Sequence, residues 1–473
     1  MTLVGELRVA YPAGGGEVTR RLADICGPRF ARAAGAADGV AGAPAQWVAA
    51  PGTVEAVTAV LRVAADHDLA VVPRGAGTKL DWGAPPSQVD IVLDTGRLAG
   101  VWHQPPGELI VEVDAGTPLR AVQAVLERTG RRLPLDVASP GATIGGVVAA
   151  DEAGPLRHRH GSPCEQLVAV SYVDATGGVK HAGGAAGDLP GRDLARLLCG
   201  SQGALGVLVS ATLRVQPAPA SRIWVSRKVW TPLEVHNLVE EILTAGLDPA
   251  AIEVDLPADR PGPTRREPVR RAARPPGSAA HPAGTAAHPA GSAAHPAGTA
   301  RPTDSGPGAG RLVVLLEGGP ADVADRARKL STLLGGAPEV ATVPPVWWRR
   351  YPFNPGDVAL RVTVPITDLH AAVYALRDAV GAPVPVRGSV GLGVVHAALP
   401  GDLPPDRVGD ILDAVRTVLL ARDGRCVVLA APEPVRHAVD LWGYLPELDE
   451  FRRVKERFDP TRRLAPGRFT GGI

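Results

Sequence analysis

Short apolar runs alternate with amphipathic segments along the first half of the chain, and this pattern predicts an α+β domain with short, mixed strands. Residues 54–64 carry apolar side chains every three or four positions after Thr53, a residue type that caps helices. Residues 70–73 are too short for a helix and run into a glycine-rich stretch, which is typical of a strand. Thr117 followed by Pro118 predicts a cap and a helix that begins at the proline. Further strands are expected at 89–93, 109–113, 168–173 and 206–215.

The alternation continues in the second half of the chain as two βαβ-type units. This order of elements favours a ferredoxin-like sheet with its helices on one face. Strands are expected at 223–229, 251–256, 312–317, 358–364, 390–398 and 426–430, and helices at 232–245, 321–334, 368–380 and 405–422. A last helix is expected at 446–458, because Asp459-Pro460 ends it.

Residues 258–310 break this pattern. They contain almost no large apolar side chain, and residues 277–298 repeat a seven-residue unit of the type GSAAHPA. Such a segment cannot bury enough surface to offset the entropy of ordering it, so we expect a disordered insertion in a strand-to-strand connection. Its three histidines, at 281, 288 and 295, could hold a metal weakly, but a drifted low-complexity loop is the simpler interpretation.

Composition narrows the class of protein. The chain has 473 residues, with 50 basic and 49 acidic side chains, and its formal net charge of +1 argues against a general nucleic-acid binder. No run approaches the ~20 apolar residues of a membrane span, and the first residues lack a secretory signal. We therefore expect a cytoplasmic protein with no integral membrane segment. Its four cysteines are scattered without a CxxC pair, so neither a metal site nor an iron–sulfur cluster is expected in this chain.

Three glycine-rich segments stand out in the first half, at residues 73–80, 139–149 and 200–207. Glycine lets backbone N–H groups approach a phosphate without obstruction by a Cβ atom. The first segment follows a predicted strand but has neither the Rossmann nor the P-loop spacing. The second, with adjacent glycines at 145 and 146, suits a chain packed flat against a planar ligand.

The order of these segments resembles the FAD-binding domain of the vanillyl-alcohol oxidase and p-cresol methylhydroxylase (PCMH) superfamily. The resemblance runs over about residues 47–217 and rests on five motifs, in the segments 73–78, 93–98, 113–119, 142–146 and 200–207. It implies a PCMH-type two-subdomain FAD-binding domain followed by a ferredoxin-like α+β substrate or cap domain. The expected units are an N-terminal segment (1–45), the FAD-binding domain (46–218), the cap domain (219–257 and 311–445), the insertion (258–310), and a C-terminal helix and tail returning to the FAD domain (446–473).

The resemblance also implies which residues hold the cofactor. The first loop and the segment around 143 would grip the pyrophosphate and flank the isoalloxazine, and residues 203–207 would lie on the adenine side. The implied FAD-binding residues are Pro73, Arg74, Gly75, Ala76, Gly77, Thr78, Pro140, Gly141, Ala142, Thr143, Gly145, Gly146, Gly203, Gly206, Val207 and Arg468. Covalent flavins of the family often use a histidine near the first loop or a later cysteine. Thr78-Lys79 follows Gly77 here, so we expect noncovalent FAD.

The end of the chain is similar to the FAD-binding subunit of bacterial glycolate oxidase. The similarity lies in residues 453–460 and 464–469, and in a GPxR motif at 154–157. The HxGDGNxH and EHGIG motifs of catalytic 2-hydroxy-acid dehydrogenases are absent, and residues 391–396 stand in the corresponding place with one histidine. The resemblance therefore leaves open whether the chain oxidises a hydroxy acid by itself.

Oxidation of a 2-hydroxy acid needs a clamp for the carboxylate and an acceptor for the hydroxyl proton. A guanidinium offers a bidentate fork to a carboxylate. The catalytic candidates are Arg361, Arg387 and His396. For Arg361 a solvated strand arginine is an equally good interpretation. For His396 a hydrogen-bonded core histidine is the simpler one.

We expect a flavin subunit of a glycolate or 2-hydroxy-acid dehydrogenase complex, which passes hydride to flavin N5 from a small acid such as glycolate or D-lactate. Expected partners are a second flavoprotein subunit and an iron–sulfur subunit, because four scattered cysteines cannot hold clusters. Any membrane association would come through these partners. Two alternatives stay open: an FAD-dependent alcohol or sugar oxidoreductase on the same scaffold, and a non-catalytic FAD-binding accessory subunit.

Overall fold

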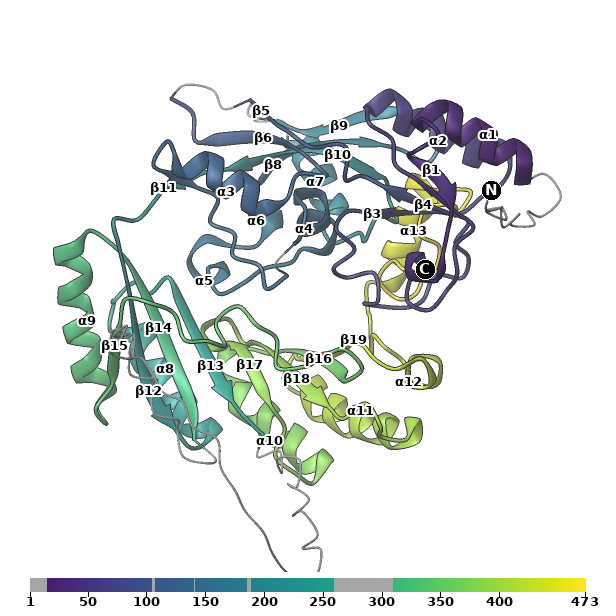
Figure 1. Ribbon diagram of the computed structural model, residues 1–473. Coiled ribbons are helices and arrows are strands. Elements are labelled where there is room, and N and C mark those ends of the chain that lie inside the picture. Colours follow the sequence, from purple (N-terminus) through teal and green to yellow (C-terminus); the bar gives the residue numbers. More distant parts are fainter. Residues whose placement is uncertain (1–14, 104–106, 140, 185–188, 259–308) are drawn as a thin grey trace, which may run out of the picture.

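The computed structural model describes residues 15–103, 107–139, 141–184, 189–258 and 309–473. The repeat insertion with its histidines, and Pro140, lie outside the described residues. The chain forms two bodies that face each other (Figure 1). The first holds β1 to β11 and the second holds one large sheet, while the C-terminal helix α13 (Leu448–Phe458) lies back beside the first.

A small mixed sheet begins the first domain. Its strand order is β1-β2-β4-β3, and β2, β4 and β3 run parallel while β1 is antiparallel to β2. Two helices cover it, and the second begins after Thr53, whose hydroxyl accepts the N–H of Ala56 as the sequence predicts for a cap. The elements are α1 (Gly15–Cys26), β1 (Ala31–Ala33), β2 (Trp47–Ala49), α2 (Val54–Asp66), β3 (Val71–Arg74) and β4 (Ile91–Asp94).

An antiparallel five-stranded sheet completes the first domain, in the order β5-β6-β10-β8-β9. The predicted helix after Thr117 begins one residue late: Pro118 is the N-cap, and the Thr117 hydroxyl instead bonds the backbone of Gly100. The elements are β5 (Val101–His103), β6 (Ile110–Asp114), α3 (Leu119–Glu127), β7 (Arg131–Arg132), α4 (Ile144–Ala150), α5 (Arg157–His160), α6 (Pro163–Gln166), β8 (Leu167–Val173), β9 (Val179–Gly183), α7 (Leu189–Leu198), β10 (Val207–Arg214) and β11 (Gln216–Pro217).

The second domain is one antiparallel eight-stranded sheet in the order β15-β12-β14-β13-β17-β18-β16-β19. Each half is a βαββαβ unit with ferredoxin-like strand order, and the halves join where β13 pairs with β17. The first half is β12 (Ser221–Val229), α8 (Pro232–Thr244), β13 (Ala251–Leu256), β14 (Gly310–Gly318), α9 (Pro320–Leu334) and β15 (Glu339–Ala341). The second is β16 (Val358–Thr363), α10 (Leu369–Val380), β17 (Val386–Ser389), β18 (Val394–Leu399), α11 (Pro405–Leu420) and β19 (Arg425–Ala430), followed by α12 (Glu433–Ala438).

This sheet confirms the predicted fold class and corrects the strands within it. The sequence predicts one strand over 390–398, whereas the chain makes β17, a short 3-10 turn at Val390–Leu392, and then β18. β17 was missed because its four residues, Val-Arg-Gly-Ser, carry no apolar alternation. The four long helices pack through one shared core on one face of the sheet. The opposite face is turned toward the first domain (Figure 1).

Two buried ionic contacts tie the parts together. Arg132 of β7 donates two hydrogen bonds to Glu317 of β14, with N–O distances of 2.7 and 2.5 Å, so a charge pair crosses the domain interface. In the C-terminal helix, the ammonium of Lys455 is 1% exposed and donates to Asp459 and to the carbonyls of Ala204 and Leu464. This lysine therefore fixes the returning C-terminus to the third glycine segment. Among the described residues, no helix is both long and apolar enough to cross a bilayer.

Candidate active site

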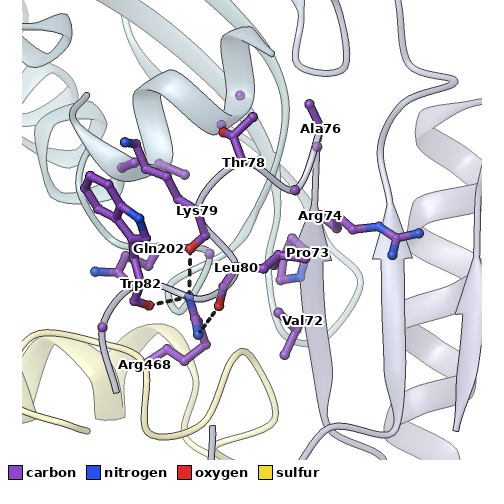
Figure 2. Close-up of a pocket in the computed structure, with 18 of the residues that line it drawn as sticks. Val72, Pro73, Arg74, Ala76, Thr78, Lys79, Leu80, Trp82, Gln202 and Arg468 are labelled. Atoms are coloured by element: carbon purple, nitrogen blue, oxygen red, sulfur yellow. Dashed lines mark hydrogen bonds between the residues drawn. The ribbon is translucent and has the colours of Figure 1, made fainter. Parts of the chain in front are cut away.

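The first and third glycine segments, with part of the second, surround one cavity between the two sheets of the first domain and the edge of the second. Figure 2 shows the first loop, from Val72 to Trp82, wrapped around it. Most of the predicted FAD-binding residues line the cavity, among them Pro73, Arg74, Gly75, Ala76, Gly77, Thr78, Thr143, Gly145, Gly146 and Gly203. Gly206 and Arg468 line it as well.

Several of these glycines leave no room for a side chain. A Cβ at Gly75 would collide with the hydroxyl of Thr143, and one at Gly203 would lie 3.0 Å from the ring of Pro73. Glycine at these two positions thus lets the first segment lie close to the second and to the third at the cavity wall. Gly77 has a φ of +73°, in the left-handed region that favours glycine.

The second segment differs from its prediction. Residues 144–150 form helix α4 instead of a chain packed flat, and Thr143 caps it by accepting the N–H of Gly146 at 3.3 Å. A Cβ at Gly145 would lie 2.8 Å from that of Ala115, so this glycine lets the helix start lie against the strand end. Helix α4 therefore presents its first turn to the cavity.

Some predicted FAD-binding residues do other work. The guanidinium of Arg74 is bound by Asp38 and Asp94, and Figure 2 shows it pointing away from Lys79. Arg468 is 4% exposed and donates to the carbonyls of Leu80 and Trp82, so it holds the loop from within. Ala142 and Val207 lie in the hydrophobic cores, and Gly141 is not among the lining residues.

A second cavity adjoins the first. Both are lined by Lys79, Trp82, Arg361 and Leu429, so the two spaces share one wall. The second lies over the open face of the large sheet and contains all three catalytic candidates. Strand pairing explains why: Asp255, Arg387, His396 and Arg361 are successive Cα partners across β13, β17, β18 and β16. One row of the sheet therefore carries Arg387, His396 and Arg361 toward the first domain.

Arg361 is a free cation at the wall between the cavities. Its side chain is accessible within the cavity space, and it has no hydrogen bond or ion pair with any residue that the structure describes. Burial lowers the pKa of its guanidinium, with Arg157 adding repulsion. An enclosed cation without a partner favours an anion beside it.

Arg387 is already occupied. Its guanidinium lies 2.8 Å from Asp255 and donates to the carbonyls of Arg350 and Tyr351 at 3.2 and 3.1 Å. Its contacts fix the loop that carries Tyr351 to the sheet. The row therefore brings the three candidates together. The guanidinium of Arg387 is paired, whereas that of Arg361 has no partner among the described residues.

A polar network missed by the sequence analysis lies beside His396. One oxygen of Glu152, Oε1, accepts from Lys79 at 3.1 Å and from the phenol of Tyr351 at 3.3 Å. The ring of Tyr351 contacts that of His396 edge to face, at 4.9 Å between centroids. Burial, together with the charges of Arg361 and Lys79, lowers the pKa of His396 to about 3, so the imidazole is neutral at neutral pH. No sequence signal joins these residues, because Lys79 and Tyr351 are 272 positions apart.

Comparison with known proteins finds an FAD-binding match in the first domain. Residues 45–183 match the family model described as "FAD binding domain". The first domain is a PCMH-type FAD-binding domain. The sequence is 35% identical over 179 residues to D-2-hydroxyglutarate dehydrogenase of Xanthomonas citri pv. viticola, covering 37% of this chain and 38% of that protein. It is 32% identical over 187 residues to glycolate oxidase subunit GlcE of Escherichia coli K12, covering 38% and 51%. It is 29% identical over 214 residues to D-lactate dehydrogenase of Archaeoglobus fulgidus, covering 44% and 46%.

These matched segments span about half or less of each relative's own length. The whole fold is matched by a solved structure of alkyldihydroxyacetonephosphate synthase, with a TM-score of 0.65. That likeness covers 98% of this chain and 87% of the other at 14% identity, so it shows the fold alone.

The first cavity of the FAD-binding domain fits a dinucleotide in its chemistry. Its wall at Gly75, Gly145 and Gly203 is bare backbone, where an added Cβ would collide or crowd a neighbour. Bare backbone of this kind can present N–H groups to a pyrophosphate. None of the described lining residues is a histidine, cysteine or tyrosine.

Proposed function

We propose that the chain is an FAD-dependent oxidoreductase whose electron donor is a small 2-hydroxy acid. The observation that carries this proposal is Arg361, a guanidinium with no partner among the described residues, on the wall shared by the FAD cavity and the second cavity. A carboxylate bound there would hold its α-carbon beside the FAD cavity. The names of the relatives, which include D-2-hydroxyglutarate and D-lactate dehydrogenases, support this class of donor.

The cofactor would be held by the glycine cradle of residues 73–78, 143–146 and 203–206. Bound FAD would supply the two-electron acceptor that the side chains cannot provide. We propose noncovalent attachment, because the cavity lining of the described residues offers no histidine, cysteine or tyrosine to form a link.

The proton of the substrate hydroxyl would go to His396. Its neutral ring lies in the same row as Arg361, and its low pKa comes from burial and from two neighbouring cations. A carboxylate bound at Arg361 cancels part of that positive charge, and so it raises the pKa of the imidazole when substrate is present. Substrate binding would therefore make His396 a stronger base. Glu152, Lys79 and Tyr351 position the ring from the other side.

The chain would act as a flavin subunit, together with a second flavoprotein subunit and an iron–sulfur subunit. Two relatives are named glycolate oxidase subunits, one from Escherichia coli and one from Bacillus subtilis. Within the described ranges no three histidine, cysteine or acidic side chains gather to hold a metal. We propose a cytoplasmic location, with any membrane contact made through the partners.

Anaerobic titration of the purified chain tests this proposal. Bound flavin should be visible in the absorption spectrum and should be released into the supernatant by acid precipitation. Glycolate, D-lactate and 2-hydroxyglutarate are added to separate samples, with ethanol and glucose as controls that lack a carboxylate. Bleaching by an acid but not by the controls supports the proposal. Bleaching by the controls alone, or by none of them, would overturn it in favour of the alcohol or sugar enzyme or the accessory subunit.

A further inference from the structure

We infer that the second cavity contains a second anion subsite, at the end away from Arg361, and that the substrate is a 2-hydroxy acid with a second anionic group. The subsite is formed by Glu253, Ser389 and Arg349. This inference rests on the proposed function for the position of the first carboxylate. The second group is a carboxylate or a phosphate, since both accept hydrogen bonds from the same donors.

The charges around the cavity are unbalanced. Six basic residues line it, and two of them are neutralised, since Lys79 is paired with Glu152 and Arg387 with Asp255. The four others have no side-chain hydrogen bond or ion pair to any described residue: Arg157, Arg349, Arg350 and Arg361. Asp151 also lines the cavity and acts on Arg361, so it offsets one of these charges. Together with Asp151, one carboxylate of a monoanionic substrate would still leave two of the four cations without a counter-charge.

Two buried polar groups at the far end also have atoms with no hydrogen-bond partner in the described part of the chain. Glu253 is 5% exposed, and its Oε1 bonds to no described residue. Ser389 lies directly opposite it across the β13–β17 pair, and its hydroxyl is buried and unpartnered as well. Buried polar atoms are rarely left unpaired, and each such atom has a cost in stability unless a ligand or water satisfies it. Both residues line the cavity, so a ligand can reach them.

The protonation state of Glu253 decides its role. Burial raises its pKa to about 8; the nearby hydroxyl of Ser389 lowers it, and the neighbouring carboxylate of Asp136 adds to the rise. The carboxyl therefore keeps its proton at pH 7 and can donate a hydrogen bond to an anion. The groups that face it are Ser389 from β17, Asp136 from the first domain, whose own pKa burial raises to about 7, and the cation of Arg349, which acts on Asp136.

The two ends are too far apart for one small carboxylate. Arg361 lies on β16 and Glu253 on β13, and three strand spacings separate them. At ~4.8 Å per spacing this is about 14 Å between strands. The arginine side chains extend into this interval, so the cavity suits a ligand with an anionic group at each end, and glycolate would contact only one.

The test compares kcat/KM for glycolate and D-lactate with kcat/KM for malate, 2-hydroxyglutarate and 3-phosphoglycerate. At pH 7 we expect the best dianionic substrate to exceed the best monocarboxylate by at least about tenfold, or ~1.4 kcal/mol. Malate and 2-hydroxyglutarate carry the second group as carboxylate, and 3-phosphoglycerate carries it as phosphate. The preferred compound therefore identifies the source of the second charge.

The pH dependence of the substrate preference, and variants at Glu253 and Arg349, test the subsite separately from the site at Arg361. Ionised Glu253 repels an anion, so the preference for the dianion should be lost as pH rises through about 8. Glu253→Gln keeps a neutral donor and should retain the preference at pH 9. Arg349→Met should lower kcat/KM for the dianion more than for the monoanion. Arg328→Met, on an exposed part of α9, is the matched control.

Binding without turnover separates the two failures. Calorimetric titration of the oxidised protein with glutarate and with acetate measures the subsite even if no acid reduces the flavin. Tighter binding of glutarate that weakens above pH 8 supports the subsite. Equal binding of the two, with monocarboxylates turned over as well as dianions, overturns the inference and leaves the proposed function intact. If the proposed function is wrong but the subsite exists, no acid will reduce the flavin, and glutarate will still bind more tightly than acetate.

Discussion

The two cavities of this protein are built by different means. The first cavity, where we propose that FAD binds, is enclosed mainly by short contiguous runs of backbone, in which Gly75, Gly145 and Gly203 let segments approach closely. The second cavity is enclosed by charged and aromatic side chains from many separate elements, among them Lys79, Glu152 and Arg361. A site that binds by its backbone leaves a compact record in the sequence, and a site that binds by side chains scatters its record over the whole chain.

The largest effect on stability should come from Lys455, the buried lysine that bonds to the third glycine segment beside the first cavity. Lys455→Met leaves Asp459, which is fully buried, without its cation. We expect a loss of about 3–5 kcal/mol in the free energy of unfolding, because an uncompensated charge stays buried. Urea denaturation measures it. Lys329→Met, at an exposed pair on α9, should change the stability by less than ~0.5 kcal/mol. Similar losses in both variants would contradict the account.

The interface pair should give the next largest effect and a dependence on pH. Burial by itself raises the pKa of Glu317, but hydrogen bonds from His160 and Arg132 outweigh it and lower the pKa to about 2. A lowered carboxyl pKa stabilises the fold above its ordinary value of 4.5, and this stabilisation is lost as pH falls toward 2. Glu317→Gln should cost about 2–3 kcal/mol at pH 7.

Urea midpoints measured for wild type and Glu317→Gln between pH 7 and pH 3 check this prediction. The difference between the two proteins should shrink as the pH falls. A difference that stays constant over this range would mean that the charge of Glu317 does not stabilise the interface.

The glycine cradle should be sensitive at one position and tolerant at another. Gly75→Val places atoms against the hydroxyl of Thr143, and overpacking of about 1–3 kcal/mol should weaken FAD binding by roughly 10- to 100-fold. Gly141→Val is the matched control, because a Cβ there meets nothing within 4 Å. Equilibrium titration of the apoprotein with FAD, followed by flavin fluorescence, measures both. Equal affinities would show that the cradle does not hold the cofactor.

The smallest effect should come from one hydroxyl of the side-chain network. Tyr351→Phe removes the phenol that donates to Glu152 but keeps the ring against His396. We expect kcat/KM to fall by up to about tenfold, which corresponds to a hydrogen bond of ~0.5–1.5 kcal/mol. Tyr444→Phe, at an exposed tyrosine, should leave the rate unchanged. A loss above 100-fold would indicate that the hydroxyl acts on the reacting atoms.

The sequence was most informative where local chemistry decides the structure. The cap at Thr53, the glycine segment at 73–78 and the helix before Asp459 follow from neighbouring residues, and the structure has them close to their predicted places. It was also sufficient for the ferredoxin-like character of the second domain, because the strands and helices alternate there with clear periodicity.

The rest depends on contacts between distant residues. β17 takes its place from pairing with β13 and β18, and its own four residues carry no strand pattern. The sequence could not separate the role of Arg387 from that of Arg361. Only the structure shows that Arg387 forms an ion pair with Asp255, whereas Arg361 pairs with no described residue. The raised pKa of Glu253 comes from burial at the domain interface, which has no signature in the residues around it.

Anaerobic reduction of the flavin in the Arg361→Met variant shows whether Arg361 binds the carboxylate of the donor. Arg425→Met is the control, because that arginine is on the same sheet but pairs with exposed Glu447. We predict that Arg361→Met retains bound FAD. Its kcat/KM for flavin reduction by 2-hydroxy acids should fall by about 100-fold or more, as expected when a charge-assisted clamp is removed. The control should reduce its flavin at the rate of wild type. Reduction of the Arg361→Met flavin at the wild-type rate would contradict the account.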